Sequence, residues 1–221
     1  AQPLASTSAQ SASTASIYQA PNTGLRVAVI DFGIKDSILR SLAQRHLNVT
    51  VFPSTASADE ILASHPDGVL LSNGPGDPKK LDYVLPTIRT LEAQVPILGI
   101  CLGHKLFALA NGADTYKMKF GHRGFNHAIQ ADHQTKTYFT SQNHGYAVDA
   151  DSIATTDLEV TQTEINDGTV EGVRLKNRPA FSVQYHPDAS PGPHDAEYVI
   201  DDFVTAMQIN SKAGVSNGKT N

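Results

Sequence analysis

The sequence has 221 residues, of which 40% are hydrophobic and 18% charged, with a formal net charge of −5 and a single cysteine. A domain of this length buries about 70% of its unfolded surface, so it needs no disulfide or metal to stabilise its core. No stretch approaches the roughly 20 apolar residues of a membrane span, and no basic run indicates a nucleic-acid partner. One cysteine and no signal-peptide pattern predict a cytoplasmic protein.

Both ends of the chain differ in composition from the middle. Residues 1–24 are dominated by Ala, Ser, Thr and Gln, and residues 210–221 are polar. Such segments bury too little apolar surface to fold, so we expect a disordered, linker-like segment at 1–24 and a disordered tail at 210–221. One folded domain is expected over residues 25–209.

The first half of this domain alternates short apolar runs with helical patterns. Buried strands are predicted at residues 27–30, 49–52, 69–71 and 95–100, with helices over residues 34–46, 59–64 and 81–93. Ser57 is expected to cap the second helix, and Pro86 to break or kink the third. Strands and helices alternating in this way predict an α/β fold with a doubly wound, mostly parallel sheet flanked by helices.

The second half has a different pattern. Strand-like runs occur at residues 137–141, 145–148, 158–163, 170–175 and 180–185, followed by a helical pattern over 195–209. The Asn-Asp-Gly sequence at 166–168 is a strong hairpin-turn signal. We therefore expect an added antiparallel or mixed region that extends or flanks the parallel sheet.

Residues 95–112 form the central stretch, in which a buried strand leads through a sharp turn at Cys101 into a helix. Gly99 and Gly103 flank the cysteine with the spacing of a nucleophile elbow. An apex residue brings the residues two before and two after it together, and glycines avoid the clash. The helix N-terminus favours a thiolate. A buried structural cysteine is the alternative, but the spacing favours a nucleophile.

A thiolate nucleophile usually works with a histidine and an orienting acceptor from elsewhere in the chain. His186 follows a predicted apolar strand, and Pro187 favours an extended backbone before it. On an extended backbone His186 and Asp188 project to the same side, so that one carboxylate can anchor the imidazole. A surface His-Pro-Asp turn is the alternative reading.

Two further patterns bear on the site. The loop at residues 73–76, Asn-Gly-Pro-Gly, follows a core strand and would let backbone N–H groups approach a ligand, although an ordinary tight turn explains it equally well. No metal site is expected, because the histidines lack HExxH or Cys/His ligand spacing. The histidines considered are His122, His127, His133, His144 and His194.

Together these motifs resemble the class I (triad) glutamine amidotransferases, a flavodoxin-like α/β family. The resemblance rests on GICLGH at 99–104, SNGPGDP at 72–78 and HPD at 186–188. Within that family, KMKFGH at 117–122, SQNHGY at 141–146 and ASPGPHD at 189–195 resemble the small, glutamine-hydrolysing chains of carbamoyl-phosphate synthetases.

The resemblance implies a function and a set of site residues. Cys101 would attack the side-chain amide of L-glutamine, His186 would act as base and acid, and Asp188 would orient His186. The implied substrate contacts are Gly74, Gly76, Leu102, Lys105, Asn143, Gly145 and Tyr146. Ammonia would pass to a large synthetase subunit, which uses ATP and Mg²⁺ to make carbamoyl phosphate for arginine or pyrimidine biosynthesis, so that no cofactor is expected in this chain.

Three features depart from the family pattern. Asp188 stands where the family usually has Glu, which predicts a longer or re-routed contact with His186. Lys105 replaces the usual Gln, and would either hold the thiolate more strongly or obstruct the glutamine site. The family's N-terminal domain, with a serine that contacts glutamine, has no counterpart here. A degenerate, non-catalytic subunit that binds the synthetase, or a free-standing γ-glutamyl hydrolase, are the alternative functions.

Overall fold

The computed structural model describes residues 17–20, 24–131 and 137–217. The strands are β1 (Tyr18–Ala20), β2 (Arg26–Asp31), β3 (Asn48–Pro53), β4 (Gly68–Leu71), β5 (Ile97–Ile100), β6 (Thr115–Ala131), β7 (Thr137–Val148), β8 (Leu158–Glu164), β9 (Val170–Leu175) and β10 (Ala180–Val183). The helices are α2 (Asp36–Gln44), α3 (Ala58–Leu62), α4 (Leu85–Glu92), α5 (Leu102–Ala110), α6 (Ala150–Ile153) and α7 (Tyr198–Asn217), with 3₁₀ turns η1 (Pro78–Val84) and η2 (His194–Ala196).

The strands form one mixed sheet in the order β1-β3-β2-β4-β5-β10-β9-β7-β6-β8. The five strands β3-β2-β4-β5-β10 are parallel, and their order along the chain is that of the flavodoxin-like doubly wound fold. The predicted α/β class and parallel sheet are therefore confirmed. In such sheets ligands bind beyond the carboxyl ends of the strands where the strand order reverses, which here lies between β2 and β4.

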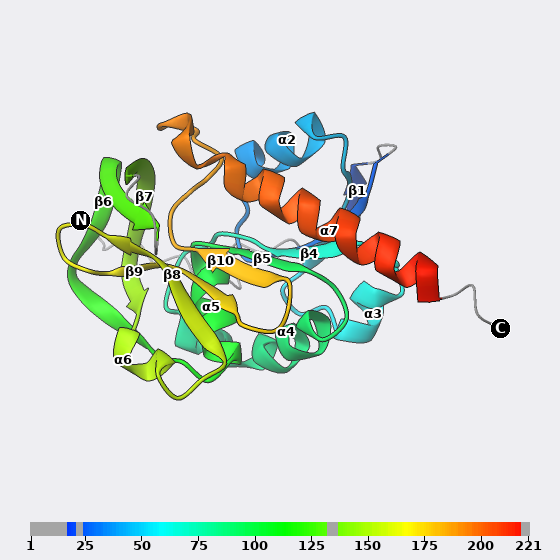
Figure 1. Ribbon diagram of the computed structural model, residues 1–221, viewed down its shortest axis with the longest axis horizontal. Helices are drawn as coiled ribbons and strands as arrows, with labels where there is room; N and C mark the ends of the chain where they lie inside the picture. The colour runs from blue at the N-terminus through cyan, green and yellow to red at the C-terminus, as the bar shows by residue number, and fades with distance from the viewer. Residues whose placement is uncertain (1–16, 21–23, 132–136, 218–221) are drawn as a thin grey trace, which may run out of the picture.

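Helices cover both faces of the parallel sheet, α2 and α7 on one side and α3, α4 and α5 on the other (Figure 1). Each face has its own apolar core, because successive strand residues point to opposite sides. In β2, Val27 and Val29 pack with the α7 side chains Phe203 and Met207, whereas Ile30 packs on the opposite face. Burial on both faces explains why the parallel strands read as continuous apolar runs.

The antiparallel region extends the sheet beyond β10 and was expected, but its longest strand was missed. β6 runs for 17 residues and pairs with β7. It carries no apolar alternation because most of its residues are exposed or half-buried, and register shifts interrupt its pairing. The two predicted strands at 137–141 and 145–148 are a single strand, β7.

Several boundaries differ from the predictions. The expected tail at 210–221 is wrong as far as Asn217, because α7 continues to that residue. Within the expected linker, Tyr18–Ala20 pairs antiparallel with β3. Pro86 lies in the first turn of α4, where its missing N–H costs no hydrogen bond, and the irregularity falls at Leu81 instead. Ser57 caps α3 as predicted. His133 and the remaining terminal residues lie outside the described ranges.

No described helix is both long enough and apolar enough to cross a membrane.

Candidate active site

The turn between β5 and α5 has the geometry of a nucleophile elbow. Cys101 adopts φ 56° and ψ −97°, a conformation that non-glycine residues rarely take. Its N–H donates to the Val183 carbonyl of β10 at 2.9 Å, and the Gly103 N–H donates to the Ser72 carbonyl at 3.0 Å. These two bonds hold the cysteine at the carboxyl ends of three neighbouring strands, with the N-terminus of α5 directly behind it.

The flanking glycines are required by close backbone contacts, as the sequence argument predicted. A Cβ on Gly99 would lie 2.8 Å from the Gly103 carbonyl oxygen. A Cβ on Gly103 would lie 2.2 Å from the Leu71 carbonyl oxygen of β4. Both contacts are with backbone, which cannot move aside without disturbing the sheet.

We expect Gly103→Ala to lower the free energy of unfolding by about 2–4 kcal/mol, because the new methyl group collides with the β4 backbone. Chemical denaturation followed by circular dichroism measures this change. Gly168→Ala is the matched control, since its Cβ would meet no atom within 4 Å and only its positive φ of 73° costs about 1 kcal/mol. Equal losses in the two variants would contradict the contact argument.

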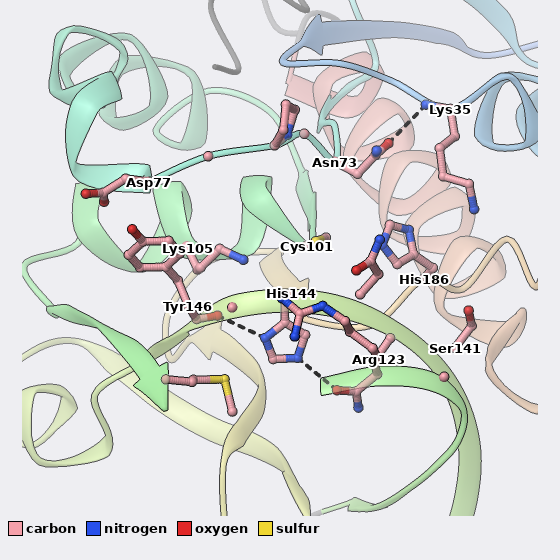
Figure 2. Close-up of a pocket in the computed structure, with 18 of the residues that line it drawn as sticks. Lys35, Asn73, Asp77, Cys101, Lys105, Arg123, Ser141, His144, Tyr146 and His186 are labelled. Atoms are coloured by element: carbon pink, nitrogen blue, oxygen red, sulfur yellow. Dashed lines mark hydrogen bonds between the residues drawn. The ribbon is translucent and has the colours of Figure 1, made fainter. Parts of the chain in front are cut away.

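A cleft of about 1100 Å³ opens over Cys101 between the elbow, the β4 loop and the β6–β7 hairpin. Of the predicted site residues, eight line it: Gly74, Gly76, Cys101, Lys105, Asn143, Gly145, Tyr146 and His186. Leu102 contributes only its backbone, since its side chain is fully buried in the core. Asp188 lies behind His186, with its side chain buried. The structure therefore brings all ten predicted residues to one place. Figure 2 shows Cys101, Lys105, Tyr146 and His186 around the cleft.

His186 is buried rather than part of a surface turn, and its backbone is tied to the sheet. Its N–H donates to the Ser141 carbonyl of β7 at 2.9 Å. The preceding strand ends at Val183, two residues earlier than predicted, and Asp188 lies in a turn rather than on extended backbone. Even so, His186 Nδ1 and Asp188 Oδ1 lie 3.7 Å apart, too far for a direct hydrogen bond but close enough for an ion pair.

The Asp188 carboxylate is held mainly by two other side chains. Its Oδ2 accepts hydrogen bonds from Lys35 Nζ at 2.8 Å and Ser37 Oγ at 2.6 Å. Burial would raise the pKa of Asp188, but His186, Lys35 and Ser37 outweigh it and hold that pKa well below its usual range. The carboxylate thus stays ionised, and its contact with His186 is the longer, re-routed one that the shorter side chain predicts.

Charges around Cys101 favour its thiolate. Burial opposes ionisation, yet the positive charges of Lys105 and His186 and the Leu102 N–H outweigh it, so that the pKa of Cys101 lies below its ordinary value. Burial likewise works against charge on His186, but the thiolate and Asp188 raise the pKa of its imidazole. The two groups therefore form a thiolate–imidazolium pair at neutral pH. Cys101 lies between Lys105 and His186 in Figure 2.

Comparison with known proteins agrees with this arrangement. The model of the class-I glutamine amidotransferase family matches residues 28–206. The chain belongs to this family. The chain is also 61% identical over 198 residues to the carbamoyl phosphate synthase pyrimidine-specific small chain of Lactiplantibacillus plantarum, covering 90% of this chain and 54% of that protein. It is 57% identical over 198 residues to the carbamoyl phosphate synthase small chain of Lactococcus lactis subsp. lactis, covering 90% and 55%.

The chain thus spans about half the length of the curated relatives that it matches. Among solved structures, a Thermoplasma acidophilum protein described as one chain of a GMP synthase superposes with a TM-score of 0.72 at 20% identity. That likeness covers 87% of this chain and 98% of the other, and it supports the fold.

The sequence predicts neither the contacts that Lys35 and Ser37 make with Asp188 nor the role of the Asn73 side chain in the predicted loop. Lys35 and Ser37 follow β2 and reach Asp188 across the point where the strand order reverses. The Asn73 side chain braces the loop at 73–76, accepting from the Lys35 N–H at 3.1 Å and donating to the Gly33 carbonyl at 3.0 Å. The rule that sites gather at such a reversal could have indicated the loop after β2, although no motif there does so.

Proposed function

We propose that this chain carries the glutaminase activity of a carbamoyl-phosphate synthetase small chain. The observation that supports it most strongly is the contact of Cys101 with His186 in a cleft lined by the predicted glutamine contacts, where the surrounding charges lower the pKa of the thiol and raise that of the imidazole. The relatives' names supply the chemical context, since each is called a carbamoyl phosphate synthase small chain.

In the proposed reaction the Cys101 thiolate attacks the side-chain carbonyl carbon of glutamine. The tetrahedral intermediate collapses when His186 gives its proton to the departing nitrogen, which leaves as ammonia. The γ-glutamyl thioester then remains on Cys101. Water attacks it while His186 takes up a proton, and cleavage of the carbon–sulfur bond releases glutamate and restores the thiolate. Asp188 keeps the imidazole oriented and favours its charged form.

The cleft offers groups for both the oxyanion and the substrate. The backbone N–H groups of Leu102 and Gly74 are proposed to stabilise the oxyanion. Gly74 is packed closely between the segment after β2 and the elbow helix, since a Cβ would lie 2.1 Å from the Phe32 carbonyl oxygen and 2.8 Å from Leu102 Cδ2. The remaining proposed glutamine contacts are Gly76, Lys105, Asn143, Gly145 and Tyr146, all of which line the cleft.

Ammonia is proposed to pass to a large synthetase subunit that uses ATP and Mg²⁺, with the product serving arginine or pyrimidine biosynthesis. The name of the Lactiplantibacillus plantarum relative favours the pyrimidine pathway. This proposal places no cofactor of the glutaminase reaction in the chain itself. The cytoplasmic location stays a prediction.

Glutamine hydrolysis by the purified chain, measured as glutamate released with and without a synthetase large subunit, tests the proposal. We expect Cys101-dependent hydrolysis that becomes faster when the large subunit is present. Binding to the large subunit without hydrolysis would favour the non-catalytic alternative. Fast hydrolysis that is indifferent to the large subunit would favour a free-standing γ-glutamyl hydrolase.

A further inference from the structure

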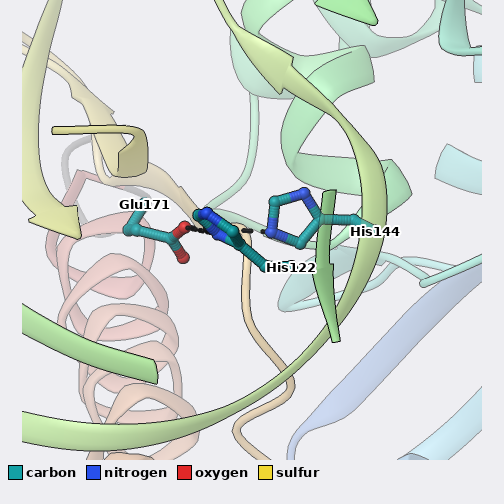
Figure 3. Close-up of side chains that lie close together, drawn as sticks. All are labelled: His122, His144 and Glu171. Carbon is teal, nitrogen blue, oxygen red and sulfur yellow. Dashed lines mark ion pairs between the residues drawn. The ribbon is translucent and has the colours of Figure 1, made fainter. Parts of the chain in front are cut away.

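Behind the cleft, three strands place two histidines and two polar side chains around one point. His122 lies on β6, Gln142 and His144 on β7, and Glu171 on β9. All four residues are buried, and Glu171 is fully so. Figure 3 shows His122, His144 and Glu171 turned toward one another. The spacing of these residues along the sequence matches no recognisable ligand motif, so only the fold brings them together.

The orientation of the Gln142 amide is determined by its neighbours. Its Nε2 donates to Glu171 Oε2 at 2.9 Å and to Thr140 Oγ1 at 3.1 Å. The Thr140 hydroxyl itself donates to the His127 carbonyl at 2.9 Å, so it must accept from Gln142. A flipped amide would therefore set an oxygen against two acceptors, and Gln142 Oε1 has to face the opposite way, toward the histidines.

The outer nitrogen of each histidine is also committed as a donor. His144 Nδ1 lies 3.0 Å from the Tyr146 carbonyl oxygen, and His122 Nε2 lies 2.9 Å from Asp167 Oδ2. Both partners are acceptors, so each of these nitrogens carries the proton of the neutral imidazole. The inner nitrogens, His122 Nδ1 and His144 Nε2, then present lone pairs.

With both histidines neutral and Glu171 ionised, four acceptor atoms meet with no proton among them. His122 Nδ1 and His144 Nε2 lie 2.9 and 2.8 Å from Gln142 Oε1. They lie 3.5 and 3.8 Å from Glu171 Oε1, which receives no hydrogen bond from any described residue. Lys105 is the nearby cation, but its Nζ donates to Gln184 Oε1 at 3.2 Å. A proton on His122, whose pKa Glu171 and Asp167 raise, would satisfy the contact of its Nδ1 but would leave His144 Nε2 facing Gln142 Oε1 at 2.8 Å. Protonating both histidines would bury two like charges with ring centroids 5.0 Å apart.

We propose that His122, Gln142, His144 and Glu171 bind one divalent transition-metal cation, with Zn²⁺ as the best fit. Zn²⁺ accepts imidazole and carboxylate ligands at about 2.0–2.2 Å in tetrahedral geometry, which requires ligand atoms about 3.3 Å apart. Four of the six distances among these atoms run from 2.8 to 3.8 Å and bracket that value, and the ligand atoms of His122, His144 and Glu171 all lie within 4.8 Å of one another. Mg²⁺ and Ca²⁺ fit poorly, because they prefer an oxygen shell of six or more ligands.

The surroundings of this site suit a metal in three further ways. Asp167 behind His122 and the carbonyl behind His144 are the outer partners that metal-binding histidines commonly have. Glu171 and Asp167 together balance a 2+ charge. Gln142 and His144 also line the large cleft, which provides a route for the cation. A bound cation would join β6, β7 and β9 next to Asn143 and Gly145, and so would position the wall of the glutamine cleft.

Titration of the chelator-treated chain with ZnCl₂, followed by calorimetry, tests the site. The titrations use a Cys101→Ala background, because the active-site thiolate and His186 could themselves bind zinc. We expect one Zn²⁺ per chain, with affinity weakened at least about tenfold by Glu171→Gln and by His122→Gln. His127→Gln is the matched control, since His127 stacks on His122 at 4.7 Å but offers no ligand, and it should leave the affinity unchanged.

X-ray absorption of the zinc-loaded Cys101→Ala chain, with all four ligands intact, gives a second readout that does not depend on whether a variant folds. A first shell of two imidazole nitrogens and two oxygens is expected. A shell without two imidazoles, the lack of saturable one-to-one binding, or affinity unaltered in a folded Glu171→Gln or His122→Gln chain would overturn the proposal. These outcomes are independent of glutamine hydrolysis, so the two proposals can fail separately.

Discussion

Replacing Cys101 by serine is expected to lower the rate of glutamine hydrolysis by at least about 10⁴-fold, as in other enzymes that lose the nucleophile of a triad. Serine has nearly the same size, but its hydroxyl does not ionise at neutral pH, so the ion pair with His186 disappears. The positive charges of Lys105 and His186 would then have no thiolate to stabilise. Glutamate release by the variant and the parent chain, each with the large subunit present, measures the loss.

This substitution has two controls, namely the folding of the variant and a substitution at a distant histidine. Cys101→Ser should stay folded by circular dichroism because the change in size is small, although loss of the ion pair with His186 lowers its free energy of unfolding. His194→Gln, a change at an exposed residue whose side chain pairs with Glu197, should leave the rate unaltered. Hydrolysis that survives in folded Cys101→Ser would show that another group is the nucleophile.

Replacing Lys105 by glutamine is expected to raise the pH at which Cys101 becomes reactive by on the order of 1 pH unit or more. The rate of alkylation by iodoacetamide is proportional to the fraction of Cys101 that is thiolate. This fraction is high above the pKa of Cys101 and decreases as the pH falls through that pKa. Lys105 is the largest charge that lowers this pKa, and it is buried, so water screens it little. The rate of alkylation measured across a pH series gives the midpoint.

Lys80→Gln is the matched control for Lys105, since Lys80 also lines the cleft but is exposed to solvent. Its removal should leave the midpoint of alkylation in place. Glutamine at position 105 is the residue that the resemblance leads us to expect there, so the Michaelis constant for glutamine reports whether Lys105 obstructs the substrate. An unaltered alkylation midpoint in Lys105→Gln would contradict the assigned role of this cation.

The elbow was predictable because its causes are local. A sharp turn from a strand into a helix requires small residues two positions before and two positions after its apex, and Gly99 and Gly103 occupy these positions around Cys101. The structure shows the backbone contacts that impose this requirement. The parallel strands can be predicted from the sequence equally well, since burial on both faces makes them continuous apolar runs. These features depend on near neighbours in the chain, which a single sequence displays directly.

The missed features depend on distant residues. Lys35 and Ser37 act on Asp188 from more than 150 positions away, and nothing in their own neighbourhood indicates that partner. Most residues of β6 are exposed or half-buried, so its polar sequence has no strand period to detect. The cluster of His122, His144 and Glu171 likewise arises from pairing among β6, β7 and β9 rather than from spacing.

The most direct measurement of the proposed chemistry is covalent capture of Cys101 by a glutamine-derived electrophile, 6-diazo-5-oxo-L-norleucine. Mass spectrometry of the chain, incubated with the large subunit present, should show one adduct per chain on the peptide that contains Cys101. An excess of glutamine should prevent the adduct, and Cys101→Ser should not form it. A folded chain that forms no adduct, or forms one elsewhere that glutamine does not block, would contradict glutamine hydrolysis at this cleft.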